Sequence, residues 1–201
     1  MFFSFDGVDG VGKSTQIQLL AEALRVRGLE VMTCRDPGGT ALGERLREIL
    51  LDHHDISIHR RSEMLLYMAS RAQLVEEMIR PALEAGKTVI SDRFLLANVV
   101  YQAHAGGLNP DDVWRVGEIA VAGVMPRLVF VLDMPAERAA QRIQRAADRM
   151  EAQGLSYLEH VRQGFLAEAR RRPNEIVVID ADRLPEAVHA DVLREAERVL
   201  R

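Results

Sequence analysis

Short apolar runs alternate along the chain with longer segments whose apolar residues recur at helical spacing. Five of the runs are rich in Val, Ile and Phe and have the length of buried parallel strands. They cover residues 2–5, 29–34, 87–92, 127–133 and 175–180. This alternation predicts an α/β fold in which helices flank a five-stranded parallel sheet on both faces.

The segments between the runs predict helices. Gly28 and Gly86 stand where a helix would end before a strand, and Pro110 and Pro135 stand near helix starts. No fixed-period repeat and no low-complexity linker interrupts the pattern, so we expect a single domain over residues 1–201. The expected helices cover residues 15–28, 42–52, 62–86, 110–123 and 135–154.

The amino-acid composition and net charge limit the kinds of molecule that the protein is expected to bind. The net charge of -4 supplies no basic field, so a nucleic acid polymer is not an expected partner. Cys34 is the only cysteine, which excludes an internal disulfide and is typical of a reducing cytoplasm. The opening MFFSFDG lacks the features of a signal peptide, and no stretch approaches the roughly 18 apolar residues of a membrane helix. We therefore expect a cytoplasmic protein with no membrane partner.

Residues 6–16 read DGVDGVGKSTQ and directly follow the first predicted strand. They match the phosphate-loop pattern G-x-x-x-x-G-K-[ST] at every fixed position. In such a loop, backbone N–H groups and a helix N-terminus face the phosphates, the lysine reaches the β and γ phosphates, and the hydroxyl ligates Mg²⁺. The predicted nucleoside triphosphate site comprises Gly7, Val8, Asp9, Gly10, Val11, Gly12, Lys13, Ser14 and Thr15.

Three further stretches bear on the phosphate chemistry. CRDPGGT (34–40) follows the second predicted strand, where a doubly wound sheet places ligand-binding loops. SDRFLLANVVYQ (91–102) puts Asp92 and Arg93 at the end of the third strand. RIQRAADRME (142–151) spaces three arginines so that they share one side of a helix, namely Arg142, Arg145 and Arg149.

Together these stretches resemble the thymidylate kinase family. That family usually shows E-G-x-D-G-x-G-K-[ST]-T-Q, R-E-P-G-G-T, D-R-Y followed by a serine pair, and D-R-I-E at the end of a lid. This chain reads DGVDGVGKSTQ, RDPGGT, DRFLLANVVYQ and DRME, and the resemblance runs from residue 1 to about residue 182. It implies a kinase that transfers the γ-phosphoryl group of ATP to dTMP, giving dTDP and ADP, with Mg²⁺ as cofactor and a homodimer as the assembly.

The arginines fit this chemistry, because two anions must meet and their repulsion must be offset. Arg93, just past a strand end, is suited to gripping the acceptor phosphate, and the resemblance gives Arg47 a contact with the same phosphate. Gly10 stands where one branch of the family carries an arginine, so the chain resembles the branch whose catalytic arginines lie in the lid. The lid implied here covers about residues 142–153, with Arg142, Arg145 and Arg149 acting beside Lys13.

The resemblance also implies a base pocket. Thymine would stack on Tyr67, and Arg71, four residues later on the same helix face, would bond a carbonyl of the base. Asn98 would face the base, since an amide suits a pyrimidine N3–H and carbonyl. Tyr101 would pack near the sugar, and Asp9 would meet the 3′-hydroxyl and assist at Mg²⁺ through water.

Two further assignments concern the ends of later strands. Asp92, at a strand end opposite the loop, is the carboxylate that we expect to bind Mg²⁺ together with the Ser14 hydroxyl. Asp133 could compete for that role. By resemblance, Ala181 would lie close to the adenine of ATP. The apolar helices at 61–84 and 111–122 could form the dimer interface or could face the sheet.

Several positions depart from the usual family residues, and two alternatives stay open. The substitutions Ala97 and Phe94 motivate a kinase for another (deoxy)nucleoside monophosphate. A nucleotide-binding switch is less favoured, because the guanine-reading [NT]-K-x-D loop is absent and the fourth strand runs instead into MPAERAAQR. The departures are Asp6 and Asp36 for glutamate, Ala97 for serine, and Phe94 and Phe165 for tyrosine.

Overall fold

The computed structural model describes residues 1–51, 56–143 and 154–200. In this part of the chain five parallel strands form one sheet in the order β2-β3-β1-β4-β5. The strands are β1 (Phe2–Asp6), β2 (Val31–Arg35), β3 (Thr88–Asp92), β4 (Leu128–Asp133) and β5 (Ile176–Asp180). Each overlaps one of the five predicted runs, so the predicted parallel sheet is confirmed.

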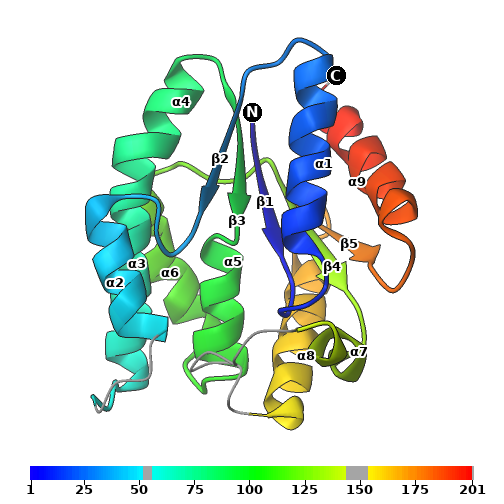
Figure 1. Cartoon of the computed structure of the whole chain (residues 1–201). Helices are drawn as coiled ribbons and strands as arrows, with labels where there is room; N and C mark the ends of the chain where they lie inside the picture. Colours follow the sequence, from blue (N-terminus) through cyan, green and yellow to red (C-terminus); the bar gives the residue numbers. More distant parts are fainter. Residues whose placement is uncertain (52–55, 144–153, 201) are drawn as a thin grey trace.

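Helices cover both faces of this sheet (Figure 1). In that view α1 and α9 lie side by side on one face, and α3, α4 and α6 lie on the other. The α-helices are α1 (Lys13–Val26), α2 (Ala41–Leu51), α3 (Arg60–Leu74), α4 (Arg80–Glu84), α5 (Leu95–Asn98), α6 (Pro110–Val121), α7 (Ala136–Gln141), α8 (Leu155–Arg171) and α9 (Pro185–Leu200). Two π-helical segments continue α3 and α5, namely η1 (Val75–Ile79) and η2 (Val99–His104).

The helical predictions need three corrections. The single helix expected over 62–86 is an α–π–α series, because η1 separates α3 from α4. The helix expected over 135–154 ends, in the described part, as α7 at Gln141. The helices α8 and α9 and the α5–η2 segment lie outside the predicted helices.

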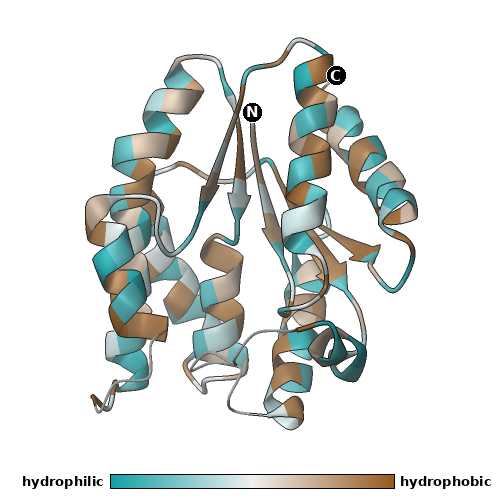
Figure 2. Cartoon of the chain, in the orientation of Figure 1, coloured by the Kyte–Doolittle hydropathy of each residue, from teal (hydrophilic) through white to brown (hydrophobic). Residues whose placement is uncertain are grey.

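The core lies between the sheet and its helices. The β1 strand is buried at every position because it occupies the middle of the sheet. Phe5 of β1 stacks on Phe130 of β4 with ring centroids 4.8 Å apart. Figure 2 shows the strands mostly in brown with teal at their carboxyl ends, while the helices carry both brown and teal, as expected for a parallel sheet covered by amphipathic helices.

The strand order also locates the site. The chain leaves β1 toward β2 and β3 on one side and then crosses to β4 and β5 on the other. The carboxyl ends of all five strands share one edge, and ligands of open α/β sheets bind where the order reverses. The loops after β1 and β3 meet at this point. Within the described residues, no helix has the length and apolar character needed to cross a membrane.

Candidate active site

The loop between β1 and α1 curls because glycines occupy its left-handed positions. Gly10 has φ 86°, and a Cβ built on it would lie 2.1 Å from the carbonyl oxygen of Ala139 on α7. Gly12, with φ 96°, precedes α1 directly. A larger side chain at position 10 would collide with backbone, so the loop has no room for the arginine that one family branch carries there.

Lys13 lies buried against this loop. Its Nζ donates to the carbonyl oxygens of Gly7 (3.2 Å) and Val8 (2.9 Å) and pairs with Asp9 Oδ1 at 3.2 Å. Burial and the nearby Arg93 guanidinium lower the pKa of Lys13. The ammonium therefore sits inside the curl of backbone where the phosphate-loop pattern requires it.

Arg93 comes directly after β3 in a conformation that is rare for a non-glycine residue. Its φ is 65°, and the surroundings hold it there: its N–H donates to the Phe5 carbonyl at 2.8 Å, and the Ser91 hydroxyl donates to its carbonyl at 2.6 Å. The guanidinium donates to Asp9 Oδ1 at 2.7 Å and packs over the Tyr101 ring at 5.1 Å. Backbone strain of this kind clusters at functional sites.

Two carboxyl groups near these cations have pKa values shifted in opposite directions. Burial opposes ionisation of Asp9, but Arg93 and Lys13 outweigh it and hold the pKa of Asp9 well below its usual range. Asp6, at the end of β1, is fully buried, and burial raises its pKa to about 7 against the pull of the same two cations. Asp9 is thus the fixed negative charge between Lys13 and Arg93.

A cavity of about 690 Å³ opens in front of the loop. We call it the loop cavity. The loop, the end of β3 and the residue after α7 all contribute to its wall. It is lined by Asp9, Gly10, Gly12, Lys13, Ser14, Thr15, Arg35, Asp36, Arg47, Asp92, Arg93, Arg142 and Ile143.

A second, smaller cavity of about 100 Å³ lies deeper, between α3 and the α5–η2 segment. We call it the inner pocket. It is lined by Asp9, Asp36, Pro37, Arg47, Leu51, Tyr67, Arg71, Arg93, Ala97, Asn98, Tyr101 and Gln102. Asp9, Asp36, Arg47 and Arg93 line both cavities, so two molecules bound in them would meet at a pair of arginines.

The polar groups of the inner pocket bond to one another. Arg71, 1% exposed, donates to Asp36 Oδ2 at 2.5 Å and to Asn98 Oδ1 at 3.0 Å. Asn98 Nδ2 in turn donates to Gln102 Oε1 at 2.7 Å, and Gln102 Nε2 donates to Glu63 Oε1 at 2.9 Å. The pocket therefore has a continuous hydrogen-bonded chain in its wall.

The seven residues predicted from the sequence to bind the acceptor all line the inner pocket. Arg47 reaches it from α2 and donates to the Pro37 carbonyl at 2.9 Å. Arg71 differs from expectation in one respect, because its guanidinium is already bonded to protein groups. The seven are Asp9, Arg47, Tyr67, Arg71, Arg93, Asn98 and Tyr101.

The remaining predicted residues divide between the loop cavity and other places. Ser14 and Asp92 both line the loop cavity, whereas Asp133 is held by Arg162 at 2.7 and 3.0 Å. Val8 and Val11 are buried, and the Gly7 and Val8 carbonyls face Lys13. Ala181 is buried at the end of β5 and lines neither cavity in the described part of the chain.

Of the predicted lid, only residues 142 and 143 lie among the residues that the structure describes. Arg142 follows α7, lines the loop cavity and is 44% exposed, with Asp182 3.8 Å away. Arg145 and Arg149 lie outside the described residues. Arg142 is therefore the lid arginine whose position can be related to Lys13.

Sequence reasoning missed Gln102 and Glu63. Each stands four residues from a residue that was predicted: Gln102 after Asn98, and Glu63 before Tyr67. Extending the helical spacing by one step would have found both. Phe94 and Phe165, each 1% exposed, are core residues, and Phe94 packs edge-on against Phe2 with centroids 5.0 Å apart.

Comparison with known proteins agrees with this geometry. The family model for thymidylate kinase matches residues 5–192. The chain belongs to the thymidylate kinase family. It is 51% identical over 178 residues to a thymidylate kinase of Rhodopirellula baltica, covering 89% of this chain and 72% of that protein. It is 46% identical to one of Pelotomaculum thermopropionicum, covering 99% and 94%.

A solved structure extends the comparison to the fold. The crystal structure of thymidylate kinase from Ehrlichia chaffeensis superposes with a TM-score of 0.81 at 28% identity, covering 98% of each chain. The resemblance drawn from the four motifs is thereby confirmed at the level of family and fold. The chain is a kinase with the phosphate-loop architecture.

Proposed function

We propose that this kinase transfers the γ-phosphoryl group of ATP to dTMP, giving dTDP and ADP on the route to dTTP. The observation that carries the proposal is the junction of two cavities at Asp9, Arg47 and Arg93. The loop cavity takes the triphosphate and the inner pocket takes the nucleoside monophosphate. Their shared wall brings the two phosphates together.

At the junction the protein supplies positive charge and position. Lys13 binds the phosphates of ATP, and Arg93, fixed by its backbone and by Asp9, grips the acceptor phosphate. Arg47 contacts the same phosphate from α2, and Arg142 closes over the donor phosphates. The acceptor oxygen is already anionic near neutral pH, because the second pKa of a phosphate monoester is about 6, so no side-chain base is required.

The donor set around the loop suits Mg²⁺. Ser14 and Asp92 offer a hydroxyl and a carboxylate on the wall of the same cavity. Mg²⁺ prefers oxygen ligands and is commonly held by one or two protein groups together with substrate phosphates. These two residues would hold the ion, which when bound neutralises phosphate charge.

The inner pocket selects the acceptor. Tyr67 stacks on the base, while Arg71 and Asn98 meet its polar edge. Tyr101 lies under the Arg93 guanidinium in the pocket wall and would pack near the sugar, and Asp9 would meet the 3′-hydroxyl. Ala181 would face the adenine of ATP at the end of β5.

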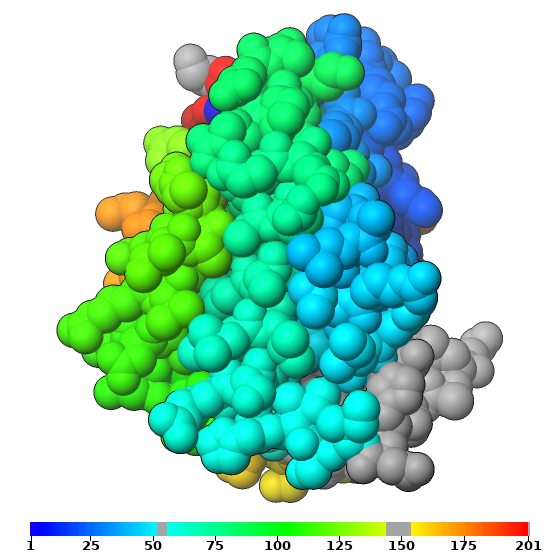
Figure 3. All heavy atoms as spheres, turned by 90° about the vertical axis from the view of Figure 1, so that its left-hand side faces the viewer, coloured from blue at the N-terminus to red at the C-terminus, as the bar shows by residue number. Residues whose placement is uncertain are grey.

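We also propose that two copies of the chain form a homodimer. Figure 3 shows one face of the molecule, along which α3 and α4 run between α2 and α6. Leu65 of α3 is 53% exposed and Ile119 of α6 is 81% exposed. Sedimentation of the wild-type chain and of Ile119→Glu tests this: the wild type should sediment as a dimer and the variant as a monomer, and a monomeric wild type would contradict it.

An ADP-release assay with ATP and Mg²⁺ tests the reaction. The acceptors are dTMP, dUMP, dCMP, dGMP and AMP, each alone, with a sample lacking acceptor. We expect ADP release that is greatest with dTMP. Greatest release with another monophosphate would mean that the inner pocket takes a different base, and release that needs no acceptor would contradict a kinase.

A further inference from the structure

The chain of hydrogen bonds in the inner pocket has a fixed direction. Arg71 at one end carries only donors, and the carboxylate of Glu63 at the other end carries only acceptors. Two amides, Asn98 and Gln102, stand between them. With a donor at one end and an acceptor at the other, every bond is made only if both amides turn their oxygens toward Arg71 and their nitrogens toward Glu63.

Glu63 lies at the outer end of this chain and is itself held. Its side chain is fully buried, it begins the i, i+4, i+8 series that continues with Tyr67 and Arg71 on α3, and Arg60 lies 3.3 Å from its Oε1. Gln102 and Asn98 line the inner pocket, but Glu63 does not. Glu63 therefore acts through the amides.

We propose that Glu63 is a positioning residue for base selection: by accepting from Gln102 it fixes that amide, and together with Arg71 at the other end it holds the Gln102 and Asn98 amides in one orientation at the pocket wall. This rests on the proposed function, in which the pocket takes dTMP. Thymine presents a donor at N3 and an acceptor at C4, whereas cytosine presents an acceptor and a donor at these positions. Amides fixed in one orientation distinguish the two patterns, and amides free to turn over do not.

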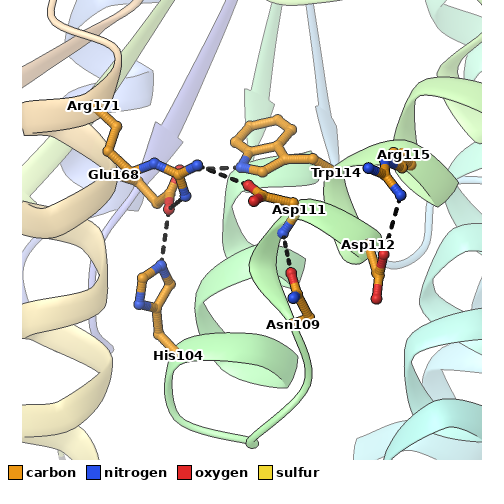
Figure 4. A network of polar contacts seen from close by, with 8 residues as sticks. All are labelled: His104, Asn109, Asp111, Asp112, Trp114, Arg115, Glu168 and Arg171. Carbon is orange, nitrogen blue, oxygen red and sulfur yellow. Dashed lines mark hydrogen bonds and ion pairs between the residues drawn. The ribbon is translucent and has the colours of Figure 1, made fainter.

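The molecule offers a matched control in a second buried glutamate. Figure 4 shows Glu168 of α8, which is fully buried and accepts hydrogen bonds from His104 (2.8 Å), Trp114 (3.0 Å) and Arg171 (2.9 Å). We call these four residues the Glu168 cluster. It joins α6, α8 and η2 and lines neither the inner pocket nor the loop cavity in the described part of the chain. Its loss would weaken packing without reaching the amides.

The test compares Glu63→Met, which removes the acceptor, with Glu63→Gln, which keeps an acceptor oxygen at the same length. The readouts are KM for dTMP, KM for ATP, the inhibition constant of dCMP and the melting temperature. For Glu63→Met we expect KM for dTMP to rise about tenfold, because the Gln102 amide loses the acceptor that fixes its orientation, while KM for ATP and the inhibition constant of dCMP change less than twofold. Glu63→Gln should restore KM for dTMP to within about threefold of wild type.

Measurements on the Glu168→Gln control and on the wild type distinguish a failure of the positioning role from a failure of the proposed function. Glu168→Gln should lower the melting temperature and leave all three nucleotide constants unchanged. Equal weakening of dTMP and dCMP by Glu63→Met, or a KM for dTMP within twofold of wild type, would overturn the positioning role. A wild-type enzyme inactive on dTMP would instead overturn the proposed function.

Discussion

The loop cavity and the inner pocket share a wall but hold their polar groups in opposite ways. In the loop cavity, Lys13 and Arg93 are paired with Asp9, which is 25% exposed, and with backbone carbonyls. In the inner pocket, Arg71 and Asn98 are 1% and 2% exposed and are bonded within one chain of side chains. One region keeps its cations beside an opening, and the other joins its polar groups to each other.

Under the proposed function, the difference follows from what each region has to recognise. A phosphate is bound by charge, so its cations must be able to exchange a carbonyl or carboxylate for a phosphate oxygen. A base is recognised by the direction of its donors and acceptors, so the groups that read it must not turn. Substitutions in the two regions should therefore separate turnover from acceptor affinity.

The largest effect should come from Lys13→Ala. If this ammonium binds the transferring phosphate, as proposed, its removal should lower kcat about 10²- to 10³-fold, while KM for dTMP changes less than threefold. Steady-state kinetics with both substrates varied would measure this. Lys87, the other lysine, is 42% exposed and pairs with Glu30 far from the loop, so Lys87→Ala is the control and should behave as wild type. A comparable loss of dTMP affinity in Lys13→Ala would break the separation of the two regions.

The next effect should come from Asn98→Ala, in the inner pocket. It removes the amide expected to face the base and interrupts the hydrogen-bonded chain. Arg71 Nη1 keeps only Met68 Sδ as a partner, and Gln102 Oε1 loses the Asn98 donor, which costs about 1–3 kcal/mol for a buried group. We expect KM for dTMP to rise about 10- to 100-fold with KM for ATP nearly unchanged. Titration calorimetry with each nucleotide would show the same asymmetry. If ATP binding weakened as much as dTMP binding, the two cavities would not be independent in the way described.

The third prediction concerns the Glu168 cluster. Because this cluster lines neither cavity in the described part of the chain, a substitution in it should change stability and leave nucleotide binding unchanged. Burial opposes ionisation of Glu168, but hydrogen bonds from His104 and Trp114 and the nearby Arg171 outweigh it and lower the pKa of Glu168 below its usual 4.5. A carboxylate with a lowered pKa stabilises the fold above pH 4.5, and this contribution is lost as the pH falls below that value. Glu168→Gln should therefore melt at a lower temperature than wild type at pH 7.

Calorimetry at several pH values would measure this linkage. The difference in melting temperature between wild type and Glu168→Gln should shrink as the pH is lowered from 7 to about 4, since the variant has no carboxyl to protonate. A difference that stayed constant with pH would show that the carboxylate charge contributes nothing. Altered KM for dTMP at pH 7 would show that the Glu168 cluster extends its influence into the inner pocket.

The two regions also differ in how much of them could be predicted from the sequence. The loop cavity is built from a contiguous motif, so Lys13, Ser14 and the glycines could be assigned before any fold was known. The strands could be predicted because each is a short apolar run in a sheet buried on both faces. Resemblance supplied the seven pocket residues.

What could not be predicted depends on pairings between distant residues. The bond between Arg71 and Asp36 joins positions 35 apart, and that between Gln102 and Glu63 joins positions 39 apart. A motif shows neither, because both follow from how α3 packs against the α5–η2 segment. The π-helical turns η1 and η2 were also unforeseen, since the apolar pattern continues through them as it would through an α-helix.

The smallest effect should come from the rim of the loop cavity. Arg35 lines that cavity but is 53% exposed and pairs at 2.7 Å with Glu44, itself 41% exposed. Exposed pairs of this kind contribute little to stability, because solvent screens them and both side chains lose freedom. Arg35→Ala should shift the melting temperature by less than about 3 °C and change kcat less than threefold.

Glu44 makes this rim test informative, because it also accepts from the Gly39 N–H at 2.7 Å and so holds the loop after β2. Glu44→Ala should therefore destabilise the protein more than Arg35→Ala does, although both break the same ion pair. A loss of kcat in Arg35→Ala approaching that of Lys13→Ala would place Arg35 among the phosphate-binding cations. The phosphate-binding cations of the loop cavity would then include the exposed Arg35 at its rim as well as Lys13 and Arg93.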